Sequence, residues 1–226
     1  MNKQKQQYKK PVAIGMTAAL VICLLGVVYY TLGDDIARLI ADSNKSEKSE
    51  TTPVQYVYDA DGYHRPSFYD PDWETDIFTL ERYLDKNRYI TFKEGGFSVM
   101  MVDEAFNEYG NAVEFLADYL DTLIHGEAEA INGFYSSEWL DANGRYESFT
   151  MQKLYDMVIE YIVSTDTDGS DGRPVTEYVY KISYKILEND GTFRSDIESD
   201  ASRPQFFTVV DDGEGLSITS VSYTLQ

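Results

Sequence analysis

Two histidines are the only side chains of this sequence that ordinarily titrate near neutral pH, and His125 stands directly before Gly126 and Glu127. A histidine acting as a base needs an acidic partner and an interior position. His125 instead follows Ile124 at the end of a helical apolar pattern, where a basic residue followed by glycine typically ends a helix. We therefore interpret His125 as a helix-terminal residue and expect no catalytic residue there. His64, in "GYHRP", is interpreted as a surface or packing residue.

The sequence lacks the motifs of nucleophilic, phosphate-binding and thiolate chemistry. It contains no Gly-x-Ser-x-Gly elbow and no glycine-rich loop of the Walker or dinucleotide type. Cys23 is the only cysteine, so the rest of the chain has no disulfide and no thiolate metal site. We therefore expect a non-enzymatic protein without a cofactor.

An acid-rich stretch, residues 166–177, partly matches a calcium-binding loop. Asp166, Asp168 and Glu177 fall at positions 1, 3 and 12 of the EF-hand pattern, but the glycine required at position 6 is replaced by Asp171. A strand-like run follows where the pattern requires a helix. We interpret the stretch as a solvated loop and keep the three residues only as weak calcium candidates.

Tyrosine is the unusual component of the composition, with 19 residues. In the alternating run 176–188, Tyr178, Tyr180 and Tyr184 share one face of the predicted strand. Such a face can bind a ligand or a partner segment, or it can form an aromatic core with its hydroxyls at the rim. We favour the core, and we keep the three tyrosines as weak candidates for ligand binding.

The amino-terminal residues have the pattern of a membrane anchor. Residues 11–32 contain no charge, and a bilayer requires roughly 20 apolar residues. Four lysines precede this run, which favours a cytoplasmic amino terminus. A cleaved signal peptide is the alternative, but no small-x-small cleavage site follows. We predict a cytoplasmic tail (1–10), a transmembrane helix (11–32), a flexible tether (33–55) and an extracytoplasmic domain (56–226, core 76–226).

The charge of the chain excludes some classes of partner. The whole chain carries −20, and the first 33 residues hold four lysines and no acid, so residues 34–226 carry −24. A surface this acidic repels phosphate backbones, and we expect no nucleic-acid partner. The absence of cysteine from the outer domain favours a bacterial envelope. We expect the chain to bind the membrane through residues 11–32 and to have a protein partner in the envelope.

The order of predicted elements indicates an α+β domain. Apolar periodicity predicts a short helix in 76–87, a long helix over 103–125 and short helices at 127–134 and 136–140. Residues 150–163 begin with a helical pattern, and we expect a change to a strand near Ile159. Strands are expected in a hairpin at 88–102 around Glu94-Gly95-Gly96, and as an antiparallel series at 176–188, 192–198, 205–211 and 216–224.

The segment "AVEFLADYLDTLIHGEAEAINGFYSSEW" and the closing strands resemble the NTF2-like superfamily over roughly residues 76–226. The Gly126-Glu127 hinge and the returning Phe134-Tyr135 pair carry the resemblance. It implies a cone of helices packed on a curved antiparallel sheet. The hairpin at 88–102 is an addition to that pattern.

The anchor followed by such a domain is also similar in architecture to VirB8-type components of conjugation machines. We therefore expect a membrane-anchored, extracytoplasmic binding or assembly module. One alternative is a VirB8-like scaffold of a conjugation or secretion machine. The other is a small-molecule enzyme of the ketosteroid isomerase or dehydratase type, which requires a buried acid beside a tyrosine or histidine.

Overall fold

The computed structural model describes residues 66–102, 105–168 and 172–225, which belong to one compact unit, Tyr56–Gln226. The predicted tail, transmembrane helix and tether lie outside these residues, as does His64. Among the helices that are described, none combines the length and the apolar character needed to cross a membrane.

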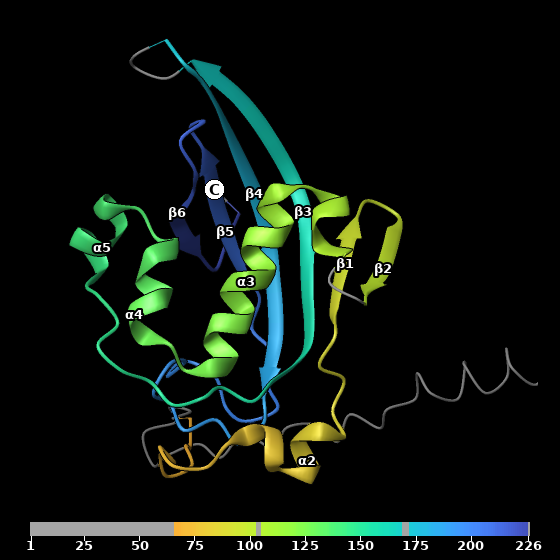
Figure 1. Ribbon diagram of the computed structural model, residues 1–226, viewed down its shortest axis with the longest axis vertical. Coiled ribbons are helices and arrows are strands. Elements are labelled where there is room, and N and C mark those ends of the chain that lie inside the picture. Colours follow the sequence, from red (N-terminus) through yellow and green to blue (C-terminus); the bar gives the residue numbers. More distant parts are fainter. Residues whose placement is uncertain (1–65, 103–104, 169–171, 226) are drawn as a thin grey trace, which may run out of the picture. The chain divides into compact units, whose positions relative to one another are not determined.

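A curved sheet of six strands forms the framework (Figure 1). The spatial order is β2-β1-β3-β4-β5-β6, and neighbouring strands are antiparallel except for the parallel pair β1 and β3. The strands are β1 (Ile90–Glu94), β2 (Phe97–Met101), β3 (Leu154–Asp168), β4 (Pro174–Ile186), β5 (Gln205–Asp211) and β6 (Leu216–Ser222). The last four form a meander, and β1 and β2 form a hairpin added beside β3.

Two irregularities in the pairing of β3 with β4 accompany the curvature of the sheet. The register shifts between Tyr155 and Val158 and again between Tyr161 and Val163. Asp156, in the first shift, has a φ of 50°. Bulges of this kind bend a strand and increase its twist. The two long strands consequently arch along the face that carries the helices (Figure 1).

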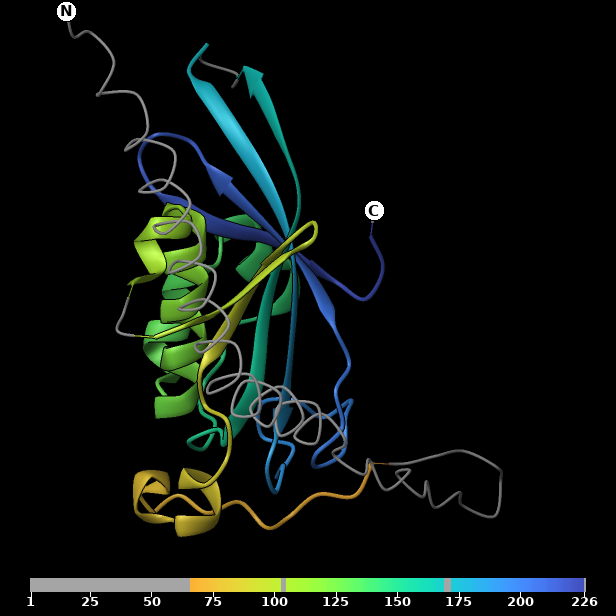
Figure 2. The same ribbon diagram turned by 90° about the vertical axis from the view of Figure 1, so that its right-hand side faces the viewer.

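The helices α3, α4 and α5 lie on one face of the sheet (Figure 2). Their bounds are Asn111–His125, Ala128–Ile131 and Ser137–Asn143, with the 3₁₀ turns η2 (Ala105–Tyr109) before α3 and η3 (Asn132–Phe134) after α4. A further turn, η1 (Ile77–Thr79), and α2 (Glu81–Leu84) precede the sheet. Asp76 accepts a hydrogen bond from the N–H of Phe78 and so caps η1.

Aromatic and aliphatic side chains fill the space between α3 and the sheet. The apolar face of α3 is buried, as its periodicity predicts. On β4 the predicted inward face is confirmed, because Tyr180, Ile182, Tyr184 and Ile186 are all buried. Residues that complete this core include Leu116, Tyr119, Leu120, Leu123, Tyr135, Ile159, Phe207, Val209 and Ile218.

The long helix is shorter than the sequence predicts. It begins at Asn111 and not at Asp103, because Gly110 has φ 103° and ψ 153°, which is incompatible with a helix. The preceding residues form η2, a separate turn. The carboxyl-terminal end of the prediction is confirmed, since α3 ends at His125 and Gly126 adopts the left-handed conformation.

Two other predicted elements are wrong. The expected helix at the start of 150–163 is absent, and a strand begins at Leu154. The expected strand at 192–198 is an irregular loop. There the side-chain amide of Asn189 donates to the carbonyls of Arg194 and Ile197, at 2.8 and 2.9 Å. Backbone groups bound in this way do not pair with a neighbouring strand. The α+β class and the remaining strands agree with the prediction.

Candidate functional site

A cleft of about 450 Å³ opens where the amino-terminal end of α3 meets the sheet. We call it the tyrosine cleft. Three of its lining residues are tyrosines of β3 and β4, and a fourth comes from η2. The complete lining is Phe92, Glu94, Tyr109, Gly110, Asn111, Ala112, Tyr161, Tyr178, Tyr180 and Asp211. Its volume is in the range typical of small-molecule sites.

The strand register explains how distant residues meet in the tyrosine cleft. Glu94 of β1 pairs with Tyr161 of β3, and Tyr161 pairs with Tyr180 of β4. Residues directly opposite one another across a sheet point to the same face. One row therefore carries the carboxylate and both phenols toward the face covered by the helices. The row continues into the core at Phe207 of β5, which is fully buried.

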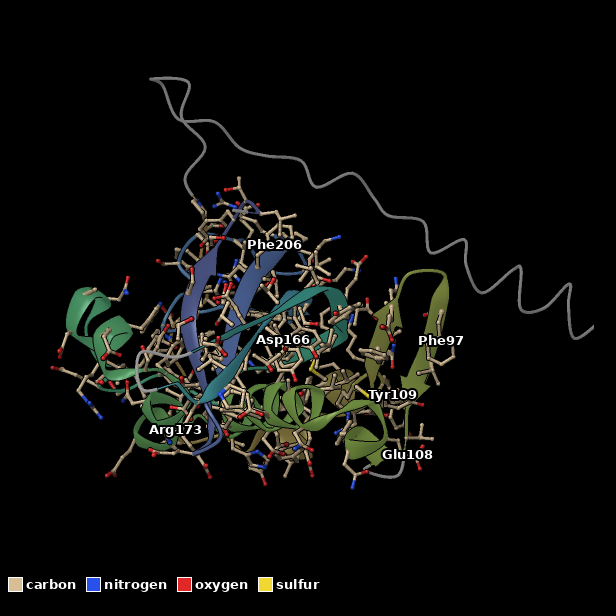
Figure 3. The ribbon with its side chains drawn as sticks, turned by 90° about the horizontal axis from the view of Figure 1, so that it is seen from above. Phe97, Glu108, Tyr109, Asp166, Arg173 and Phe206 are labelled. Atoms are coloured by element: carbon tan, nitrogen blue, oxygen red, sulfur yellow. The ribbon has the colours of Figure 1, made fainter. Side chains whose placement is uncertain are left out.

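Aromatic rings in close contact form the walls of the tyrosine cleft. The ring of Tyr180 is 5.7 Å from that of Tyr161 and 6.3 Å from that of Tyr178, measured between centroids. Tyr109 lies 5.0 Å from Phe92 and 6.4 Å from Phe97. Figure 3 shows Tyr109 beside the β1–β2 hairpin, while Glu108 points away from it. These contacts between rings hold the wall of the cleft together.

The hydroxyl groups of this wall differ in their surroundings. Tyr161 donates to the Ser164 hydroxyl over 2.9 Å. Burial raises the pKa of Tyr180, and the neighbouring Tyr178, Tyr161 and Glu94 raise it further. Within the described part of the chain, the hydroxyls of Tyr178 and Tyr180 have no hydrogen-bond partner. Both hydroxyls can donate a hydrogen bond to a ligand in the cleft.

Two carboxylates border the tyrosine cleft. Glu94 is exposed and Asp211 is half-buried. Asp211 accepts a hydrogen bond of 2.9 Å from the N–H of Gly213. Among the described residues neither acid forms an ion pair, and no lysine or arginine lines the cleft. The cleft therefore combines aromatic faces with uncompensated negative charge.

The predicted tyrosine candidates divide between two environments. Tyr178 and Tyr180 line the tyrosine cleft, as the ligand-binding interpretation requires. Tyr184 does not, because it is buried and its hydroxyl accepts a hydrogen bond of 3.2 Å from Arg194. Tyr178 and Tyr180 therefore lie together at the cleft, and Tyr184 packs in the core.

The calcium candidates lie on the projecting hairpin of β3 and β4, not in a loop (Figure 3). Asp166 is paired with Thr176 and accepts a hydrogen bond of 2.9 Å from its hydroxyl. Glu177 is the next residue of β4 and points to the other face of the hairpin. Over the ranges that the structure describes, no three or more His, Cys, Asp or Glu side chains are grouped so that they could hold a metal ion. Asp168 lies farther along the hairpin, opposite Pro174.

His125 occupies the last turn of α3, as predicted. Its Nδ1 lies 2.9 Å from the carbonyl oxygen of Asp121 and 3.3 Å from the Asp121 carboxylate. Its ring lies 5.2 Å from that of Phe78. The tyrosine cleft adjoins the other end of α3, so His125 is not one of its groups.

A second cleft, of about 470 Å³, lies beside η1 and the start of β3. Glu188 in its lining pairs with both Arg82 and Lys153, and Asp70, Asp72 and Asp190 border it as well. Gln152 Oε1 is the one buried side-chain polar atom in the described residues that lacks a partner. The side-chain Nε2 of Gln152 donates to the carbonyl oxygen of Thr150 at 2.9 Å, which holds the Gln152 side chain against the segment that precedes β3. It differs from the tyrosine cleft in containing basic side chains and only one aromatic residue, Tyr69.

The core between α3 and the sheet contains a hydrogen-bonded pair of buried tyrosines, Tyr119 and Tyr135. The hydroxyls of Tyr119 and Tyr135 are 2.7 Å apart, and the ring of Tyr135 stacks on Trp139 at 3.9 Å. Burial raises the pKa of both phenols well above the ordinary value. The aromatic core therefore stays neutral at pH values where an exposed tyrosine ionises.

We expect the domain to lose stability above about pH 10. Unfolded tyrosines ionise near that pH, whereas Tyr119 and Tyr135 keep their protons when folded. A raised folded pKa gives stability that is complete below the unfolded pKa and is lost as the pH rises. Urea midpoints between pH 8 and 11.5 measure the effect. Tyr135→Phe is the control, and an equally steep decline in that variant would contradict the assignment.

Comparisons with known proteins returned no match. No family model matches the chain, and no curated protein or solved structure matches it.

Glu94, Asp211, Tyr161 and Tyr109 were not predicted as site residues. A signal for the two acids exists in the sequence. The inward-facing alternation Ile90, Phe92 on β1 ends in Glu94, and the alternation Phe207, Val209 on β5 ends in Asp211. An acid that continues an apolar face marks the point where that face leaves the core.

Proposed function

We propose that this protein is a membrane-anchored, extracytoplasmic binding or assembly module, and that it acts without catalysis. The observation that carries the proposal is the tyrosine cleft, where free hydroxyls and uncompensated carboxylates surround aromatic faces. Tyrosines supply contact area at low entropic cost and are frequent in recognition sites. The uncharged run 11–32 after a lysine-rich tail supports the anchor.

The NTF2-like type remains part of the proposal. The meander of β3 to β6 supports it, as does α3, which packs on the sheet and is followed at Gly126 by short helices. The hairpin of β1 and β2 extends the sheet beyond that plan. A VirB8-like scaffold is a narrower form of the same proposal, and it predicts co-purification with other envelope components.

Enzymatic activity in the cone is the less favoured alternative. General acid–base catalysis by a carboxyl group near pH 7 uses a desolvated acid. The buried polar residues of the described chain are Asn132, Thr150, Gln152, Asn189 and Arg194. Glu94, the acid beside Tyr161, is exposed. These surroundings suit binding better than proton transfer.

Membrane topology tests the anchor. We expect the full chain to stay in the membrane fraction after carbonate washing, because residues 11–32 are long enough to span the bilayer. Protease added to spheroplasts should digest the carboxyl-terminal domain. Deletion of residues 11–32 should release the protein from the membrane. A wild-type chain that is washed free, or a domain protected until the cells are lysed, would contradict the proposal.

Photo-crosslinking in intact cells tests the binding role. A photoreactive phenylalanine at Tyr178 should form a discrete adduct that is lost when Tyr161→Ala is added. The same amino acid at Glu177, the neighbouring residue on the opposite face, should not form that adduct. Turnover of a small molecule by the full chain that vanishes with Glu94→Gln would instead favour the enzyme.

A further inference from the structure

We infer that the tyrosine cleft binds an organic cation, either an ammonium or a guanidinium group. The inference rests on the proposed binding function and specifies its ligand. Three features carry it: the aromatic faces, the two carboxylates without counter-ions, and the contrast with two lysine-paired acids on the opposite face of the sheet.

Aromatic faces are the first feature. Tyr161, Tyr178 and Tyr180 form a continuous wall, with ring centroids 5.7 and 6.3 Å apart, and Tyr109 lines the same cleft beside Phe92. The face of a phenol ring attracts a cation within about 6 Å of its centroid. Several such rings around one cavity are the usual means of binding alkylated ammonium groups.

The carboxylates are the second feature. Glu94 stands in the same sheet row as Tyr161 and Tyr180, and Asp211 ends the inward-facing series of β5. Within the described residues no basic side chain pairs with either acid. A cation that enters the cleft therefore meets negative charge that the protein has not already neutralised.

Two acids on the opposite face of the sheet, Glu160 and Asp156, are paired with lysines. Glu160 binds Lys181 at 3.0 Å, and Asp156 binds Lys185 at 3.0 Å. Both pairs join β3 to β4. Glu160 and Lys181 are the sequence neighbours of Tyr161 and Tyr180, but they point to the other face. Lysines thus neutralise these two acids on the opposite face, whereas none in the described part of the chain pairs with Glu94 or Asp211.

The positive end of the α3 dipole opposes the binding of a cation, but this partial charge is smaller than the charge of the two carboxylates. Gly110 provides no side-chain cap, so the positive end of the helix is open beside the cleft. That end is equivalent to roughly half a positive charge. Glu94 and Asp211 together carry two negative charges, and the balance at the cleft remains negative.

The same chemistry can come from a free amine or from a lysine or arginine side chain of a protein partner. Calorimetric titration of the full chain in dodecyl maltoside micelles distinguishes them, because this detergent carries no cationic group. Choline and arginine amide represent free cations, and a short arginine-containing peptide represents a partner segment. The neutral isostere of choline, 3,3-dimethylbutan-1-ol, is the matched control ligand.

Choline is expected to bind at least about tenfold more tightly than its neutral isostere, since only the charged molecule interacts with the ring faces and carboxylates. Glu94→Gln and Asp211→Asn should each weaken binding by about threefold or more, and raised salt should weaken wild-type binding. Glu177→Gln, an exposed acid on the opposite face of β4, should leave binding unchanged. A preference for the peptide over both free cations identifies a protein partner as the source.

Equal binding of choline and its isostere, equal effects of Glu94→Gln and Glu177→Gln, or no binding of any cationic probe would each overturn the inference. These results leave the proposed binding function intact if the adduct at Tyr178 still forms in cells. Loss of that adduct contradicts the binding function itself. The two failures are therefore distinguishable.

Discussion

Gly126→Ala is expected to lower the free energy of unfolding by about 2–4 kcal/mol, because it combines backbone strain with a steric clash. Gly126 has φ 70° and ψ 28°, a conformation that costs alanine roughly 1 kcal/mol. An added Cβ would also lie 2.9 Å from Met151 N and 3.0 Å from the carbonyl carbon of Thr150. Backbone atoms cannot rotate away as a side chain can.

The position couples the end of α3 to the start of the sheet. Gly126 donates to Leu123 O at 3.1 Å and Glu127 donates to Thr122 O at 3.2 Å, which together close the helix. Gln152 N also donates to Leu123 O, at 3.2 Å. Displacing the segment at Met151 therefore disturbs the helix end and the entry into β3 together.

Gly95→Ala is the matched control for this prediction. Gly95 has φ 55° at the turn between β1 and β2, and nothing lies within 4 Å of an added Cβ. Its substitution should cost only the conformational term, about 1 kcal/mol. Urea unfolding of the full chain in micelles, followed by tryptophan fluorescence, measures both variants. Equal midpoints for the two would show that the close approach at Met151 has no energetic consequence.

Local patterns predicted the elements whose pairing is also local. The Glu94-Gly95-Gly96 turn predicted the hairpin, and strict alternation predicted the inward face of β4. The strand β3 was missed at its start because Leu154, Tyr155 and Val158 are spaced like a helix face. The bulge at Asp156 interrupts the alternation that would have identified a strand. Its parallel pairing with β1 depends on contacts remote in sequence.

The candidate site was predictable only in part for the same reason. Alternation placed Tyr178 and Tyr180 on one face, but it could not separate them from Tyr184. The separation arises because Arg194, from a loop that was interpreted as a strand, contacts the Tyr184 hydroxyl. Glu94 joins the site through the register of β1 on β3. No spacing rule within the sequence specifies that register.

Arg194→Met is expected to destabilise the domain by about 3 kcal/mol, since it removes a buried cation whose hydrogen bonds satisfy buried and half-buried acceptors. The guanidinium binds both carboxylate oxygens of Asp196, at 2.6 and 2.9 Å, and Gln205 Oε1 at 2.6 Å. It also donates to the buried Tyr184 hydroxyl. Methionine fills similar space but satisfies none of these acceptors.

The effect of Arg194→Met should depend on pH through Asp196. Burial alone would raise the pKa of this carboxyl, but the hydrogen bonds and charge of Arg194 outweigh burial and lower it. A depressed folded pKa gives stability that is present above the unfolded value, near 3.9, and is lost as the pH falls through the folded value. The difference in urea midpoint between wild type and Arg194→Met should therefore narrow below about pH 4.

Arg203→Met separates the buried arginine from its exposed neighbour. Arg203 also contacts Asp196, at 3.4 Å, but half of its side chain is exposed, and its guanidinium stacks over the Tyr223 ring at 3.8 Å. An exposed pair of this kind contributes less than about 1 kcal/mol. Arg194→Lys keeps the charge without the planar fork and should fall between the two methionine variants. If Arg194→Met and Arg203→Met unfold at the same urea concentration, the buried fork does not hold the 192–198 loop on β4.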